Sequence, residues 1–202
     1  TGGVEANGHG HHEVVNISVE DYLKKSKTFR HCAKGYRVPI DFNGSAPLQV
    51  EPYFLGYWLG DGVSGSQEVV VGDRDSEIVG ELHSYAARLG MEVVFREGRG
   101  CRLARISRGK DGNRNELRYD LADLGVIKNK HIPHKYKVSS RRNRLDLLAG
   151  ILDADGHLSG KCYDFISASE SISNDVAFVA RSLGLSAIVS KSVKKCGNNG
   201  HL

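Results

Sequence analysis

The pattern of apolar residues predicts two long amphipathic helices, over residues 76–90 (SEIVGELHSYAARLG) and 171–184 (SISNDVAFVARSLG). In both segments apolar side chains recur at i, i+4 and i+8, so they share one face of a helix. A more uniformly apolar helix is expected before each of them, in YFLGYWLGDG, which ends at Gly62, and in DLLAGILDADG, which ends at Gly156.

The ends of the two apolar helices carry recognisable signals. Pro52 suits the first turn of the first helix, and Ser140 or Asn143 could cap the second. Gly62 and Gly156 each follow the last helical residue, where a glycine in the left-handed conformation is common. We therefore expect both glycines to have positive φ.

Short segments rich in β-branched residues separate these helices. The expected strands are QEVVVGD, MEVVFR, CRLARIS, KCYDFISAS and SAIVSKSV, and RNELRYDLADLG is expected to be a closing helix. The segment EVVNISVEDYLKKSK predicts a strand and a short helix near the start of the chain. We predict the order αββαββα for the first half, with QEVVVGD as the β-rich stretch between its first two helices. The second half is expected to follow the same order but is incomplete at residue 202.

The two halves are an internal repeat, because Asp61 and Asp155 can be superposed by an offset of 94. The same offset places Ile78 on Ile172 without a gap. We predict an α+β protein with a duplicated, pseudo-twofold αββαββα fold. The predicted domains are an N-terminal segment, 1–50, a first unit, 51–142, and a second unit, 143–202.

Small residues recur at i, i+4 in the two apolar helices, as Gly56 and Gly60 and as Gly150 and Ala154. Glycine inside a helix costs about 1 kcal/mol relative to alanine, and small residues allow two helices to approach closely. We expect the two helices to pack side by side and to bring their terminal aspartates together.

Asp61 and Asp155 would then lie at two helix C-termini, where the helix dipole is already negative. Two such carboxylates repel each other, so one stays protonated or a cation joins them. Mg²⁺ suits carboxylate oxygens and water, and it could support phosphodiester hydrolysis.

The net charge of the chain is only +4, but basic residues are concentrated between Arg96 and Arg144, with fifteen Lys or Arg against five Asp or Glu. Such a region is typical of a polyanion-binding surface. We expect an arginine-bearing hairpin to lie in a DNA groove. The predicted DNA contacts are Arg96, Arg99, Arg102, Arg105, Arg108, Lys110, Lys128, Lys135 and Lys137 in the first unit, and Lys161, Lys191 and Lys194 in the second.

Composition excludes other classes of protein. The sequence has no apolar run of about eighteen residues, so we expect no membrane span. Its four cysteines lie far apart without CxxC spacing, which favours a reducing compartment over a disulfide framework.

The segment LLAGILDADG resembles the LAGLIDADG motif almost letter for letter, and FLGYWLGDG is a looser copy. With KHIP ahead of the second copy, the chain resembles LAGLIDADG homing endonucleases, especially those of fungal inteins of the vacuolar-ATPase type. The resemblance implies paired motif helices, two sheets that form a saddle over DNA, and acidic metal ligands at Asp61 and Asp155. It also implies that the backbone carbonyls of Gly60 and Ala154 assist the metal and that Lys130 is catalytic.

We therefore predict a site-specific endonuclease that cuts both strands of a long, asymmetric DNA target with Mg²⁺ or Mn²⁺. It is expected to be an intracellular monomer with internal pseudo-dimer symmetry, nuclear if the host is a eukaryote. As written, from Thr1 to His201-Leu202, the chain is not expected to splice. The alternative is a nucleic-acid-binding module without cleavage, either maturase-like or a degenerate intein remnant.

Overall fold

The computed structural model describes residues 14–42, 44, 46–72, 75–98, 101–108 and 115–193 of the 202-residue chain. The chain divides into two units, Thr1–Tyr36 and Arg37–Leu202. Each unit is described by itself.

The first unit contains two short helices, α1 (Val19–Lys24) and α2 (Lys27–Cys32). The side chains of Ser18 and Ser26 cap them by accepting backbone N–H bonds. The expected strand is absent from residues 14–17, so that prediction was wrong. The described part of this unit offers no strand to pair with, whereas serine caps favour helix starts.

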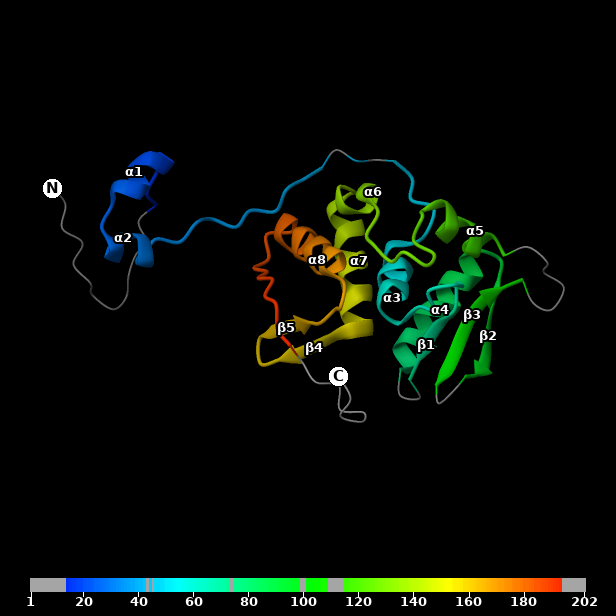
Figure 1. The fold of residues 1–202 in the computed structure, drawn as a ribbon. Helices are drawn as coiled ribbons and strands as arrows, with labels where there is room; N and C mark the ends of the chain where they lie inside the picture. Colours follow the sequence, from blue (N-terminus) through cyan, green and yellow to red (C-terminus); the bar gives the residue numbers. More distant parts are fainter. Residues whose placement is uncertain are drawn as a thin grey trace. The chain divides into compact units, whose positions relative to one another are not determined.

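The second unit is an α+β assembly (Figure 1). In chain order its elements are α3 (Pro52–Asp61), β1 (Val69–Val71), α4 (Ser76–Arg88), β2 (Glu92–Glu97), β3 (Arg102–Ser107), α5 (Glu116–Asp123), α6 (His134–Lys137), α7 (Arg141–Asp155), β4 (Gly156–Ser159), β5 (Cys162–Phe165) and α8 (Glu170–Ser182). No helix in the described ranges is long and apolar enough to cross a membrane.

The first three strands form one antiparallel sheet in the order β1-β3-β2. Its pairings include Val69 with Ala104 and Phe95 with Ala104. Because side chains alternate between faces, these three residues share a face, and all belong to or pack against the core that includes Leu82 of α4. Helix α4 lies behind this sheet in Figure 1. The other face of the sheet points away from α4.

The hairpin β4–β5 follows α7 directly, with Gly156 paired to Phe165. In the first repeat, after α3, the corresponding hairpin is reduced to a single bridge between Gly62 and Val69. Residues 186–193, expected to be a strand, pair with no strand in the described part of the chain, so that prediction was wrong. The complete αββαββα order is therefore not observed in either half.

The 94-residue offset nevertheless recurs in the helices. Adding 94 to the bounds of α4 gives 170–182, which are the bounds of α8. Gly90 and Gly184, just after these helices, both have positive φ, 64° and 82°. Equivalent sequence positions therefore end equivalent helices in the same way.

Helices α3 and α7 pack with their backbones in contact. A Cβ added to Gly150 would lie 2.1 Å from the carbonyl oxygen of Tyr53, and one added to Gly56 would lie 2.2 Å from that of Leu147. These separations are far below van der Waals contact. Glycine at both positions is therefore a steric requirement of the helix pair.

The predicted helix starts are found, since Pro52 opens α3 and the Ser140 side chain caps α7. The prediction of positive φ for Gly62 and Gly156 was wrong, because both are extended, with φ of −74° and −82°. Glycine is required at these two positions for a steric reason. A Cβ would lie 2.2 Å from the carbonyl oxygen of Trp58 at Gly62, and 2.4 Å from that of Leu152 at Gly156.

Arg144 is completely buried and joins three segments of the second unit. Its guanidinium donates to the carbonyl oxygens of Ile40, Ser139 and Ser182. It also faces the ring of Phe42, 4.8 Å from the ring centre. Burial lowers the pKa of Arg144, but these acceptors compensate the buried charge and fix residues 40–42 against α7 and α8.

We predict that Gly150→Ala destabilises the protein by about 1–3 kcal/mol, because the new methyl group collides with backbone atoms of α3. The matched control is Gly80→Ala in α4, where a Cβ meets no atom within 4 Å. That control is expected to stabilise by up to about 1 kcal/mol. Urea unfolding of both variants checks the prediction, and equal effects would contradict it.

Candidate active site

Asp61 and Asp155 are the last residues of α3 and α7, at the same end of the helix pair. A Cβ built on Gly60 would lie 2.5 Å from the Cβ of Ala154 and 3.1 Å from Oδ2 of Asp155. The four residues that the sequence analysis grouped as metal ligands are thus brought together by the close helix contact. Asp61 is half-buried and Asp155 is more exposed.

Lys130 reaches this point from the loop between α5 and α6. Its ammonium group donates to the carbonyl oxygen of Gly60 at 2.8 Å and lies 5.3 Å from the ring centre of Trp58. The loop is fixed by Lys128, whose backbone N–H donates to the carbonyl oxygen of Ser64 at 2.7 Å. Lys128 has a φ of 60°, which is uncommon for a residue other than glycine and marks a constrained turn.

The three ionisable groups shift one another's protonation. Burial, and after it the charge of the neighbouring Asp155, raises the pKa of Asp61 to about 6, although Lys130 opposes the shift. Burial also raises the pKa of Asp155, again against Lys130. Burial lowers the pKa of Lys130, although both aspartates favour its charged form. A cation bound at this point would favour the ionised form of both carboxylates.

The donors at this site are hard oxygens, which fit Mg²⁺ and similar ions. They are the two carboxylates and the carbonyl groups at the ends of two helices, which lack partners further along the helix. Among the described residues there is no group of three or more His, Cys, Asp or Glu side chains that could hold a metal. A metal here would therefore keep several water ligands or use oxygens of a bound molecule.

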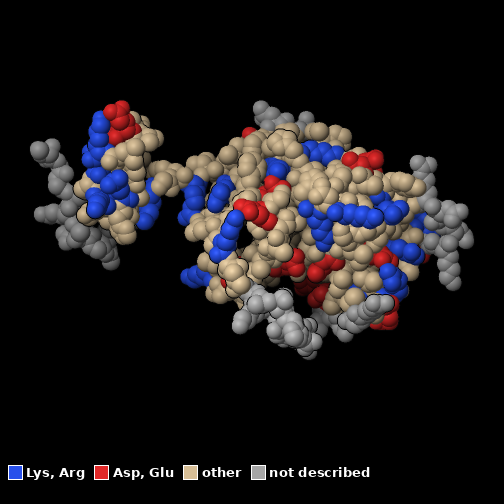
Figure 2. All heavy atoms as spheres, in the orientation of Figure 1, with Lys and Arg blue, Asp and Glu red and all other residues tan. Residues whose placement is uncertain are grey.

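An open cleft of about 510 Å³ lies beside the two helix ends. Gly60, Lys130 and Asp155 line it on one side, together with Lys128, and residues 166–169 line it on another. Figure 2 shows acidic atoms gathered in a hollow near the ends of α3 and α7. Asp155 and Lys130 are accordingly accessible from this cleft.

Tyr53 and Asp153 form a second contact between α3 and α7, with the Tyr53 hydroxyl donating to Asp153 at 2.8 Å. The sequence analysis did not identify this pair. Asp153 has no acidic counterpart in the first repeat, where Leu59 occupies the equivalent position. The internal repeat therefore gave no indication that Asp153 pairs with Tyr53.

The predicted DNA contacts of the first sheet divide between its two faces. Strand pairing places Arg96 and Arg105 on the face that points away from α4. Arg102 lies on the α4 side, with its guanidinium 3.9 Å from the ring centre of Phe95. Arg108 follows β3 and pairs with Glu116 at 2.7 Å.

The predicted basic contacts outside this sheet have varied surroundings. Lys137 is partly buried and pairs with Asp175 at 2.5 Å, whereas Lys191 pairs with Glu170 at 3.1 Å on the surface. Lys135 bonds to Gln49, and Lys161 lies in the turn between β4 and β5. Arg99, Lys110 and Lys194 lie outside the described residues.

Residues 131–201 match the family model of the homing endonucleases. This region, about a third of the chain, is similar to homing endonuclease domains. It begins one residue after Lys130 and includes α7 with Asp155. The family implies a DNA endonuclease, and its members generally use divalent metals.

A second comparison relates the chain to a replicative DNA helicase, DnaB, of Mycobacterium intracellulare, with 32% identity over 136 residues. The match covers 67% of this chain but only 19% of the helicase sequence. Because this relative is bacterial, the comparison gives no support to the predicted resemblance to fungal inteins. Together the two matches are consistent with an intein-encoded homing endonuclease.

We predict that Asp61→Asn stabilises the protein in EDTA at pH 7.5. The wild-type carboxyl has a raised pKa of about 6, so the folded state binds the proton more tightly than the unfolded state. Wild-type stability should therefore fall as pH rises from about 4 to 6. The expected gain is about 1–2 kcal/mol, since one pKa unit corresponds to about 1.4 kcal/mol and solvent screens a half-exposed group.

Thermal unfolding between pH 4 and 7.5 measures this effect. Asp164→Asn, at an exposed position on β5, is the control and should follow the wild type. An Asp61→Asn variant with the wild-type pH dependence would contradict the prediction.

Proposed function

We propose that the chain is part of an intein-encoded homing endonuclease that hydrolyses both strands of a specific DNA target. The observation that carries the proposal is the pair of carboxylates, Asp61 and Asp155, at adjacent helix ends. The Lys130 ammonium group lies beside them and donates to the carbonyl oxygen of Gly60 in α3. Two carboxylates and one ammonium group in this arrangement suit metal-dependent phosphodiester hydrolysis. The family match supports the same reaction class.

Each residue has a distinct proposed role. Asp61 and Asp155, with the carbonyl oxygens of Gly60 and Ala154, would hold Mg²⁺ or Mn²⁺. A bound divalent ion would lower the pKa of water and stabilise negative charge on phosphate oxygens. Lys130, already desolvated, offers a positive charge that can stabilise the transition state or help orient the attacking water.

The helicase relative supports a proposal about the DNA target. The chain spans about a fifth of that protein, as expected if the shared segment is an insertion in a helicase rather than the helicase itself. We propose that the target is the helicase gene without the insertion, across the junction where the insertion would lie. The two halves of that site differ in sequence, which suits two non-identical halves of the chain.

DNA would lie against the side of the molecule that carries the cleft and the sheet face opposite α4. Arg96 and Arg105 face that side from β2 and β3, and Lys128 lines the cleft itself. The other predicted basic residues remain proposed DNA contacts. For Lys137 and Lys191, contact with DNA would require their ion pairs with Asp175 and Glu170 to break.

We predict that the protein linearises a plasmid carrying the uninterrupted helicase junction in Mg²⁺ or Mn²⁺, and that EDTA abolishes cleavage. Asp61→Asn and Asp155→Asn should each lower the cleavage rate by at least about 100-fold while duplex affinity changes little, because the acids serve the reaction. A plasmid with the insertion in place is the control substrate. Tight binding without cleavage under all these conditions would favour the binding-module alternative.

We also predict that Lys130→Gln lowers the cleavage rate by about 100-fold or more, because it removes the positive charge at Gly60. It should also shift the pH midpoint of any residual cleavage upward, since Lys130 holds the pKa of Asp61 down. Lys34→Gln in the first unit is the control. A Lys130→Gln variant with the wild-type rate would remove this residue from the mechanism.

A further inference from the structure

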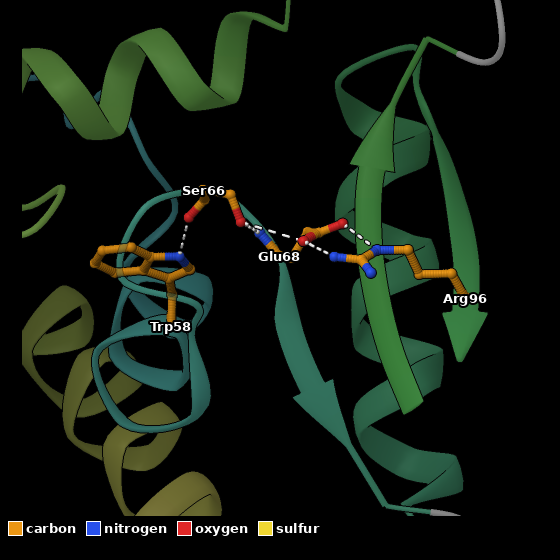
Figure 3. Close-up of polar contacts among 4 residues, drawn as sticks. All are labelled: Trp58, Ser66, Glu68 and Arg96. Atoms are coloured by element: carbon orange, nitrogen blue, oxygen red, sulfur yellow. Dashed lines mark hydrogen bonds and ion pairs between the residues drawn. The ribbon is translucent and has the colours of Figure 1, made fainter. Parts of the chain in front are cut away.

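An ion pair between Arg96 and Glu68 lies on the sheet face that points away from α4 (Figure 3). Arg96 is paired across strands with Leu103, and Glu68 immediately precedes Val69, the first residue of β1. The pair therefore spans the sheet, from its β2 edge to its β1 edge. The Glu68 side chain is only 10% exposed, whereas that of Arg96 is 54% exposed.

The contact is bidentate. Nε of Arg96 donates to Oε1 of Glu68 at 2.8 Å, and Nη2 donates to Oε2 at 2.6 Å. Hydrogen bonding to Arg96 is the main reason why the pKa of Glu68 is lowered. The carboxylate is accordingly ionised, and it fixes the plane of the guanidinium.

Glu68 is itself held in place by the turn before β1. The backbone N–H of Glu68 donates to the Ser66 hydroxyl at 3.2 Å, and that hydroxyl donates to Oε2 of Glu68 at 3.4 Å. The carbonyl of Ser66 accepts the indole N–H of Trp58 at 2.9 Å. Trp58 is fully buried in α3, so the orientation of Arg96 is anchored to the helix that carries Asp61.

A nearly buried carboxylate is unexpected on a surface that faces DNA, because it repels phosphate. Paired with Glu68, Arg96 also carries little net charge, which weakens its attraction for the DNA backbone. What the pair provides is a fixed orientation of the guanidinium group. Glu68 occupies the Nε–Nη2 edge of the guanidinium, so the parallel N–H groups of the Nη1–Nη2 edge point away from the carboxylate.

We propose that Arg96 reads a guanine in the major groove of the target and that Glu68 is its positioning residue. A guanidinium edge with two parallel donors matches the N7 and O6 acceptors of guanine, a combination that other bases do not present. The inference rests on the DNA-binding part of the proposed function. It goes beyond a general DNA contact, because it assigns one base and explains the acidic partner.

The test measures base preference without requiring cleavage or knowledge of the target. Wild-type protein selects duplexes from a randomised library in EDTA, and affinities are then measured for single base-pair substitutions of the selected sequence. We expect one G·C pair whose replacement by A·T lowers wild-type affinity by about 5- to 150-fold. Replacing that guanine by 7-deazaguanine, which lacks the N7 acceptor, should also lower affinity.

Two variants separate base reading from charge. Arg96→Lys keeps the charge but loses the fork and should lose the preference at that pair. Glu68→Gln should lose the preference as well, while its affinity for all duplexes rises at low salt and the salt dependence steepens by about one phosphate contact, because Arg96 is then a free cation. The control is Arg88→Lys, which alters a similar surface pair with Glu51 and should keep the preference.

A uniform loss of affinity in Arg96→Lys, with a shallower salt dependence, would make Arg96 a phosphate contact and overturn the proposal. Retention of the guanine preference in Arg96→Lys would overturn it as well. Thermal unfolding shows whether Glu68→Gln folds, and if it does not, Arg96→Lys decides. The cleavage assay separately tests the proposed function, so a protein that binds without cutting would refute the nuclease and leave this measurement intact.

Discussion

The contact between α3 and α7 determines where the chemistry of this protein can occur. Gly56 and Gly150 allow each helix backbone to touch the other, and that contact brings Gly60 and Ala154 together one residue before each helix ends. Asp61 and Asp155 follow at once. A wider helix pair held by large side chains would separate the carboxylates and remove the electrostatic conflict that makes the site suitable for a cation.

The site combines unfavourable features that the rest of the fold has to support. Two acids lie at the negative ends of two helices, which by itself costs stability. Burial and the nearby Asp155 also raise the pKa of Asp61. Lys130 offsets part of it from a loop whose conformation is fixed at Lys128. The buried core around Trp58 and Tyr57 supplies the rigidity that keeps these charges close together.

The same core also connects the site to the proposed DNA-reading surface. Trp58 contacts Lys130 through its ring and Ser66 through its indole N–H. Ser66 in turn contacts Glu68, the partner of Arg96. One buried side chain thus contacts Lys130 and, through Ser66 and Glu68, fixes the orientation of Arg96. Under the proposed function, this would align a target base with the proposed point of cleavage.

The sequence by itself determined the helices, their repeat and the residues that meet at the site. Periodicity located α4 and α8, the small residues of α3 and α7 indicated close packing, and matched aspartates indicated a shared site. These features can be read from the sequence because each depends on residues close together in the chain or on a comparison of its two repeats. Only the tertiary structure decided that Gly62 and Gly156 are extended, that residues 186–193 pair with no described strand, and that Glu68 orients Arg96. Such features depend on which atoms meet across long sequence separations, where steric contact and partner availability override local preference.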